Sequence, residues 1–221
     1  MRWILGTANF GNMYKDLMVG QQLAISILDK AWDLGIRDLD TARSYGLSEN
    51  MIGEYIQKTG HKFRVWTKGR SAEDYEESKK ILGFIPYNFL WHNWEELDEV
   101  KIQIDGISIY HGVDWIDAFH KNGISSIQFP WNIIDRDSEW QAERAHQYGL
   151  ATVARSIFIK GEAFKMPDIA GAPFWQWCLD VPDCFDYVVI GADTPEQLEQ
   201  VITAPRLNLV YTEEGVKCQR Q

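Results

Sequence analysis

Two patterns of apolar and polar residues follow one another repeatedly along the chain. Short apolar runs, typical of buried strands, are followed by longer segments in which apolar residues recur every three or four positions, as in amphipathic helices. In the first such segment Leu23, Ile27, Ala31 and Leu34 share one face, and Gly35 directly after it predicts the end of the helix. The pattern therefore predicts a strict alternation of strands and helices.

Eight strand-and-helix units follow from this pattern. The expected strands are Trp3–Gly6, Ile36–Asp40, Phe63–Thr67, Asn88–His92, Gly106–Tyr110, Ser126–Phe129, Ala151–Ala154 and Tyr187–Ile190. The expected helices are Gln21–Leu34, Ser48–Lys58, Ala72–Leu82, Trp94–Val100, Val113–Lys121, Asp137–Tyr148, the short pieces Lys160–Lys165 and Phe174–Leu179, and Pro195–Ile202. Ser48 and Thr194 are expected as N-caps, and the tail from Leu207 has no assigned element.

This order predicts the fold class. Eight alternating units imply a parallel sheet, and a parallel sheet of eight strands that closes on itself is the (β/α)8 or TIM barrel. We expect a single domain over residues 1–221 with shortened loops, because no linker or low-complexity tract divides the chain. The alternative is an open doubly wound sheet, although no G-x-G-x-x-G sequence follows the first strand.

Charge and hydropathy limit the partners. The formal net charge of −10 makes nucleic acid and anionic membranes unfavourable partners. No apolar run approaches the ~20 residues of a membrane helix, and the N-terminal segment is too short for a signal peptide, so we expect a cytoplasmic protein. The three cysteines lack the spacing of a metal site, and we expect no metal. The oligomeric state is not indicated.

Candidate chemistry lies at the carboxyl ends of the predicted strands, where barrel enzymes place their active sites. Asp40 ends the second strand and Tyr45 follows it, Lys68 ends the third strand, and His92 ends the fourth. Because these strands are neighbours in the predicted barrel, the four side chains can converge.

The four residue types suit proton transfer to an oxygen. A nearby ammonium group lowers the pKa of a phenol, and bringing a tyrosine from its usual value near 10 to ~7–8 requires roughly 3–4 kcal/mol. Asp40 would keep Lys68 charged, and His92 could donate a hydrogen bond to a substrate carbonyl oxygen. Each residue alone also has an ordinary interpretation: a turn cap, a packed aromatic ring, a solvated lysine and a half-buried imidazole.

The sequence around these residues resembles the aldo-keto reductase family. The similarity is carried by LGTANFG, GIRDLDTARSYGLSENMIGEYI, WTKG and FLWHN, and later by GISSIQFPWNIIDR, TVARSIFIKGEAF and VVIGADTPEQLEQVI. The resemblance implies that Tyr45 is the proton donor, that Lys68 and Asp40 tune it, and that His92 orients a carbonyl. It also implies NADPH or NADH as the cofactor, bound across the barrel mouth.

The residues that the resemblance assigns to the cofactor come mainly from the second half of the chain. They are Gly6, Thr7, Gln128, Arg155, Ser156, Phe158, Lys160, Gly191, Ala192, Gln197 and Gln200. Among them, Gln128 is expected to contact the carboxamide. Arg155 takes the place of a tyrosine that stacks on the nicotinamide in many members, and a guanidinium can also stack on a ring.

Three departures from the family pattern change the expectations. The cations that often bind the 2′-phosphate of NADPH are replaced by Gly191 and Gln197, so we expect NADH to bind within about tenfold of NADPH. The Ser-Asn pair after the fifth strand is Ser108-Ile109, so one carboxamide contact is expected to be lost. The loops are short and the N-terminal hairpin is missing, so Trp3 and neighbouring aromatic residues are expected to fill the lower end of the barrel.

Three functions are compatible with these residues. The first is NAD(P)H-dependent reduction of an aldehyde or ketone to an alcohol by an enzyme of low substrate selectivity. The second is a cofactor-binding sensor or partner-binding module with little turnover, which the shortened loops would suit. The third is a barrel lyase or isomerase that uses Lys68 or His92 without a nicotinamide.

Overall fold

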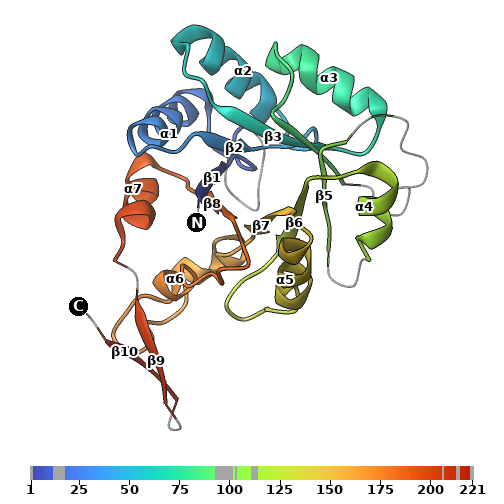
Figure 1. The fold of residues 1–221 in the computed structure, drawn as a ribbon. Coiled ribbons are helices and arrows are strands. Elements are labelled where there is room, and N and C mark those ends of the chain that lie inside the picture. Colours follow the sequence, from blue (N-terminus) through green and yellow to red (C-terminus); the bar gives the residue numbers. More distant parts are fainter. Residues whose placement is uncertain are drawn as a thin grey trace.

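The protein is an eight-stranded parallel barrel surrounded by helices (Figure 1), described by a computed structural model over residues 2–11, 18–92, 102, 104–110, 114–205, 207–212 and 215–219. The strands pair in chain order and β8 pairs with β1, which closes the barrel. Their bounds are β1 Arg2–Gly6, β2 Asp38–Asp40, β3 Arg64–Gly69, β4 Asn88–Trp91, β5 Gly106–Ser108, β6 Ser126–Pro130, β7 Ala151–Arg155 and β8 Tyr187–Gly191. The predicted (β/α)8 barrel is confirmed, and the open doubly wound sheet is wrong.

The helices follow the predicted order with shifted ends. They are α1 Gln21–Asp33, α2 Ser48–Thr59, α3 Ala72–Leu82, α4 Ile116–Asn122, α5 Glu139–Gln147, the 3-10 helix η2 Ile159–Phe164, α6 Phe174–Trp177 and α7 Pro195–Thr203. Helix α3 agrees with the prediction at both ends. The predicted helix Trp94–Val100 lies outside the described residues.

One of the two predicted N-caps is correct. The Thr194 hydroxyl accepts a hydrogen bond from the Gln197 amide at 3.2 Å, as an N-cap should. Ser48 is not a cap, because α2 is preceded by Leu47 and the Ser48 hydroxyl is buried. That hydroxyl donates to Thr7 Oγ1 at 2.7 Å, so it joins α2 to the end of β1.

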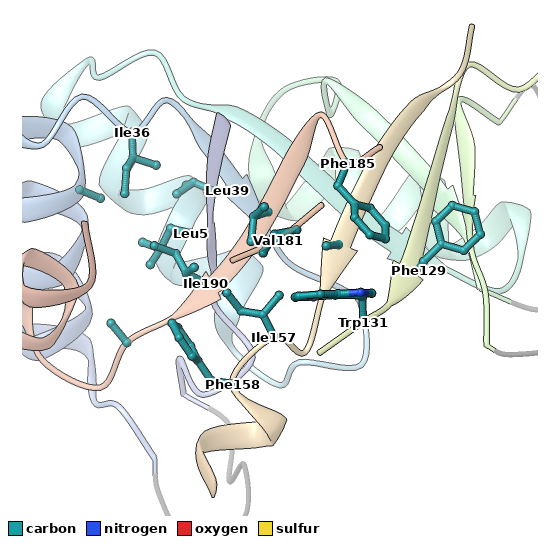
Figure 2. Close-up of a cluster of buried hydrophobic side chains, with 14 of the residues drawn as sticks. Leu5, Ile36, Leu39, Phe129, Trp131, Ile157, Phe158, Val181, Phe185 and Ile190 are labelled. Carbon is teal, nitrogen blue, oxygen red and sulfur yellow. The ribbon is translucent and has the colours of Figure 1, made fainter. Parts of the chain in front are cut away.

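Hydrophobic side chains fill the space between the barrel and its helices. Figure 2 shows part of this layer, where residues of the strands and of the segments after β7 and before β8 pack together. The labelled members are Leu5, Ile36, Leu39, Phe129, Trp131, Ile157, Phe158, Val181, Phe185 and Ile190. All belong to one buried cluster, which fixes the strands that carry the polar side chains at the mouth.

A second, smaller cluster fills the barrel interior. It consists of Ile4, Trp66, Leu90, Val153 and Tyr187. The Trp66 and Tyr187 rings lie 5.2 Å apart between their centroids, so aromatic residues do fill this region. The prediction that Trp3 does so is wrong, because alternate residues of a strand face opposite sides and Trp3 packs against the outer cluster.

The tail forms an element that the sequence analysis did not assign. Strands β9 (Asn208–Thr212) and β10 (Gly215–Gln219) pair antiparallel as a two-stranded ribbon, which extends away from the barrel in Figure 1. Among the described residues, no helix is both long and apolar enough to cross a membrane.

Candidate active site

A buried ion pair joins the ends of β2 and β3 at the barrel mouth. Lys68 Nζ lies 2.6 Å from Asp40 Oδ2 and also donates to the Thr41 carbonyl oxygen at 2.9 Å. Both side chains are buried, at 4% and 6% exposure. Burial lowers the pKa of Lys68, and the Asp40 carboxylate opposes that shift. The structure thus brings together two of the four predicted residues in direct contact.

The Asp40 carboxylate has a second partner. Gln128 Nε2 donates to the same Oδ2 atom at 2.7 Å, and Gln128 Oε1 accepts from the Ser108 hydroxyl at 2.9 Å. The side-chain amide of Gln128 is therefore fixed inside the site by β5 and β2. Its predicted contact with a carboxamide stays a prediction, and it would have to share this amide with Asp40.

His92 lies on the other side of this network. Its Nδ1 is 3.1 Å from the Ser108 carbonyl oxygen, and because a carbonyl only accepts, Nδ1 must carry a proton. Burial lowers the pKa of His92, as do the positive charges of Lys68 and Arg155. The imidazole is therefore neutral at neutral pH, with Nε2 as an acceptor. The predicted hydrogen bond from His92 to a carbonyl oxygen is not available in this form.

Tyr45 lies beside the ion pair, in the segment between β2 and α2. Lys68 Nζ is 5.3 Å from the centroid of the Tyr45 ring. The pKa of Tyr45 is nevertheless raised, first by burial and then by the Asp40 charge, and it is lowered in part by Arg155. The expected fall of the Tyr45 pKa to ~7–8 is therefore not found, because burial and the Asp40 charge favour the protonated phenol.

Arg155 is a second cation at the mouth, contributed by the end of β7. Its Nη2 donates to the Ile109 carbonyl oxygen at 3.0 Å, and its guanidinium lies 4.7 Å from the centroid of the Tyr110 ring. Tyr110 in turn lies 5.8 Å from the His92 ring and is half exposed. Arg155, Tyr110 and His92 therefore form one wall of the site.

Sequence reasoning missed the support under the Tyr45 segment. Glu49 on α2 is buried, accepts from Thr67 Oγ1 at 2.6 Å and from Ser78 Oγ at 2.7 Å, and forms an ion pair with Arg43. The Arg43 amide also donates to the Lys68 carbonyl oxygen at 2.9 Å. A glutamate placed in the first turn of a predicted helix was the available signal, but its partners come from three other segments.

This support yields a stability prediction. Glu49→Ala leaves Arg43 without a buried partner and two hydroxyls without an acceptor, so we expect the free energy of unfolding to fall by about 3 kcal/mol. Denaturant unfolding measures this. The matched control is Glu77→Ala, because exposed Glu77 contacts the same Arg43 at 3.3 Å and should cost less than about 1 kcal/mol. Equal losses in both variants would contradict the role given to Glu49.

The residues assigned to the cofactor occupy different environments. Gly6 and Gly191 are paired neighbours on β1 and β8, and Gly6 is also paired with Asp40. Thr7 is buried with its hydroxyl on the Asp40 carbonyl oxygen at 2.9 Å. A Cβ placed on Gly191 would meet no atom within 4 Å, so the space beside the end of β8 is open. The assignment of these residues to the nicotinamide stays a prediction.

The other assigned residues differ in accessibility. Ser156 and Lys160 have left-handed backbone conformations with φ of 66° and 55°, in the segment that follows β7. Phe158 packs in the hydrophobic core with its ring 4.9 Å from that of Phe164, so its side chain is not free for a ligand. Ala192 is buried, Gln200 is exposed, and Gln197 accepts a hydrogen bond from a neighbouring amide. A contact between Phe158 and the cofactor would have to be made by its backbone, and the assignment stays a prediction.

Two tryptophans near the strand ends, Trp91 and Trp131, do not line the mouth. Trp91 and Trp131 are buried at 5% and 1% exposure in the outer cluster. Trp131 also donates to Glu139 Oε1 at 2.7 Å. Trp94 lies outside the described residues. Core packing therefore explains the two described rings, and Tyr110 is the exposed aromatic residue beside the site.

The mouth of the barrel thus combines a buried lysine–aspartate pair, a protonated tyrosine and a neutral histidine. Residues 2–84, which contain Asp40, Tyr45 and Lys68, match the sequence model of the aldo/keto reductase family. Residues 2–84 are thus similar in sequence to the aldo/keto reductase family, and the barrel has the fold of solved aldo-keto reductases.

Two curated relatives extend the sequence comparison. The uncharacterized oxidoreductase YqkF of Bacillus subtilis is 27% identical over 179 residues, which are 65% of this chain and 58% of that protein. The D-threo-aldose 1-dehydrogenase of a Pseudomonas species is 44% identical over 66 residues, 28% of this chain and 20% of that protein. The chain thus spans less than two thirds of the length of either relative.

Solved structures match the fold along nearly the whole chain. The holo form of the aldo-keto reductase AKR11C1 from Bacillus halodurans superposes with a TM-score of 0.72 at 21% identity, covering 92% of this chain and 86% of that one. An aldo-keto reductase from Klebsiella pneumoniae in complex with NADP and acetate gives 0.70 at 17% identity, covering 96% and 88%. These likenesses establish a common fold.

Proposed function

We propose that this protein reduces an aldehyde or ketone to an alcohol with NADPH or NADH. The observation that carries the proposal is the buried Lys68–Asp40 pair next to a protonated Tyr45, at the end of the barrel where such enzymes hold their substrates. Burying an ion pair often costs more free energy in desolvation than the attraction returns, so such a pair is weak evidence for stability. Its position at the barrel mouth therefore favours a catalytic role.

Each residue of the site has a separate role in this reaction. A bound nicotinamide supplies hydride to the carbonyl carbon. Tyr45 donates its hydroxyl proton to the carbonyl oxygen as negative charge develops there. Lys68 and Arg155 stabilise the tyrosinate that remains, and Asp40 with Gln128 holds the lysine in place. The raised pKa of Tyr45 keeps the acid loaded throughout the neutral range.

His92 has an orienting role in this proposal. Its neutral ring donates from Nδ1 to the Ser108 carbonyl oxygen and leaves Nε2 as an acceptor. An acceptor there can take a hydrogen bond from a hydroxyl group next to the reacting carbonyl. This feature suits small hydroxylated aldehydes, and the proton itself comes from Tyr45.

Substrate selectivity is expected to be low. Discrimination requires contacts that differ between substrates, and one methylene in a closed pocket is worth ~1–3 kcal/mol. The described wall of the mouth offers Tyr110, Arg155 and His92. Small activated aldehydes should therefore be reduced with high KM and with little difference among them.

A panel of aldehydes and ketones tests the function. Each is mixed with the protein and reduced cofactor, and loss of the cofactor's absorbance is followed. We expect turnover of several small aldehydes with kcat/KM values within about a hundredfold of one another. Cofactor binding without turnover of any member would favour the sensor or partner-binding module. One substrate preferred by about a thousandfold would reveal a closed specific pocket.

A further inference from the structure

We infer that the barrel selects NADH over NADPH through Asp193 and the residues that follow it. The inference rests on the proposed function, because it concerns the cofactor of that site, and it goes further than the relaxed choice expected from the two missing cations. TIM barrels commonly bind phosphate with the loops after their seventh and eighth strands and the helix that follows. Asp193 lies in the loop after β8, directly before α7.

The Asp193 carboxylate is held in place by a hydrogen bond to one of its two oxygens. Its Oδ1 accepts from Asn9 Nδ2 at 2.7 Å, and this contact bridges the segments that follow β1 and β8 at the mouth. Asn9 is itself buried and also donates to the Ala192 carbonyl oxygen at 3.4 Å. Within the described part of the chain, no hydrogen bond or ion pair involves Oδ2. A held carboxylate with a free oxygen is the group that binds a ribose diol in NAD enzymes.

The beginning of α7 already holds a carboxylate of the chain itself, that of Glu196. The Thr194 hydroxyl accepts from the Gln197 amide, and Gln197 Oε1 accepts from the Asp193 amide at 2.8 Å. The Glu196 carboxylate takes hydrogen bonds from its own amide and from the Thr194 hydroxyl, which lowers its pKa. Free amides and a positive helix end are what usually attract a phosphate. Here the chain's own side chains occupy them.

Charge in this region is negative throughout. From Gly191 to Thr203 the sequence contains three carboxylates and neither lysine nor arginine. Lys30 reaches α7 from α1, but its Nζ is paired with Glu199 at 3.2 Å. A 2′-phosphate would therefore add a second negative group beside Asp193, and the residues Gly191–Thr203 supply no cation to balance it. A ribose with a free 2′-hydroxyl would instead donate to Oδ2.

Equilibrium binding tests the inference without any turnover. Energy transfer from tryptophan to bound NADH or NADPH gives both Kd values for the full chain. At about 0.15 M ionic strength we expect NADH to bind at least about tenfold more tightly. Asp193→Asn removes the charge and replaces the accepting Oδ2 by an amide donor, so NADPH should tighten by about tenfold and NADH should weaken.

Asp183→Asn is the matched control. Asp183 is an exposed residue in the segment before β8, at the opposite end of the barrel, and its replacement changes the net charge equally. It should leave the ratio of the two Kd values within about twofold of the wild type, because the charge lies beyond a Debye length of about 8 Å. Equal movement of the ratio in both variants would mean that net charge, not Asp193, sets the preference.

The outcomes separate this inference from the proposed function. If both cofactors bind and NADPH binds as tightly as NADH or more so, the selectivity is overturned and the proposed reduction stands. A variant at Lys160 would then show whether that exposed cation holds the phosphate. If neither cofactor binds, the proposed function and this inference fail together. The wild-type ratio decides the inference even if Asp193→Asn does not fold.

Discussion

Replacing Tyr45 by phenylalanine is expected to lower kcat for carbonyl reduction by a factor of about 10²–10⁴, the usual cost of losing one general acid. The Kd of the reduced cofactor should stay near that of the wild type, because the hydroxyl is proposed to contact the substrate oxygen. Steady-state kinetics with one small aldehyde and a binding titration measure the two quantities.

Tyr110→Phe is the matched control for this variant. Tyr110 is a half-exposed tyrosine of the same wall, 5.8 Å from the His92 ring. Loss of its hydroxyl should change kcat by less than about tenfold, since it is not the proposed acid. If Tyr45→Phe retained more than about a tenth of the wild-type kcat, the assignment of the proton donor would be wrong.

Lys68→Met is expected to remove activity by a comparable factor and to move the pH profile. Tyr45 must be protonated to act as the acid, so activity falls as pH rises through its pKa. Removing the ammonium leaves the Asp40 charge unbalanced beside the phenol, which favours the neutral form and raises that pKa. The alkaline limb of kcat against pH should therefore shift to higher pH.

A double variant separates tuning from folding. Lys68→Met leaves a buried carboxylate unpaired, which is expected to cost about 3–5 kcal/mol of stability. Adding Asp40→Asn removes that charge, so stability should recover in part and the alkaline limb should return toward lower pH. An unchanged profile in the single variant, with activity retained and the fold intact by circular dichroism, would show that Lys68 does not act on Tyr45.

The fold could be predicted because it depends on the spacing of apolar residues and on the order of strands and helices. Strand β3 and helix α3 are each encoded by neighbours in sequence, and eight alternating units leave few ways to close a parallel sheet. The ends were less certain: the predicted strand begins at Ile36, but β2 begins at Asp38. The ribbon Asn208–Gln219 was missed because its two strands follow the last barrel unit and had no place in the predicted repeat.

The residues of the site could be predicted from the sequence, but the pKa shift of Tyr45 and the tautomer of His92 could not. Asp40 and Lys68 meet because neighbouring parallel strands end at the same edge. The direction of the Tyr45 pKa shift was not predicted, because burial of the phenol raises its pKa more than the surrounding charges change it. The tautomer of His92 likewise depends on the Ser108 carbonyl of another strand. Neither relation is visible from spacing along the chain.

The central claim is that this barrel moves a hydride to a carbonyl carbon and a proton from Tyr45 to its oxygen. The most direct test is a single turnover of a small aldehyde with reduced cofactor deuterated on the nicotinamide ring, followed by mass spectrometry of the alcohol. We expect deuterium on the carbinol carbon with the wild-type protein, and transfer slower by about 10²–10⁴-fold with Tyr45→Phe. A wild-type protein that binds the cofactor yet transfers no deuterium, or a Tyr45→Phe variant that transfers it as fast, would contradict the account.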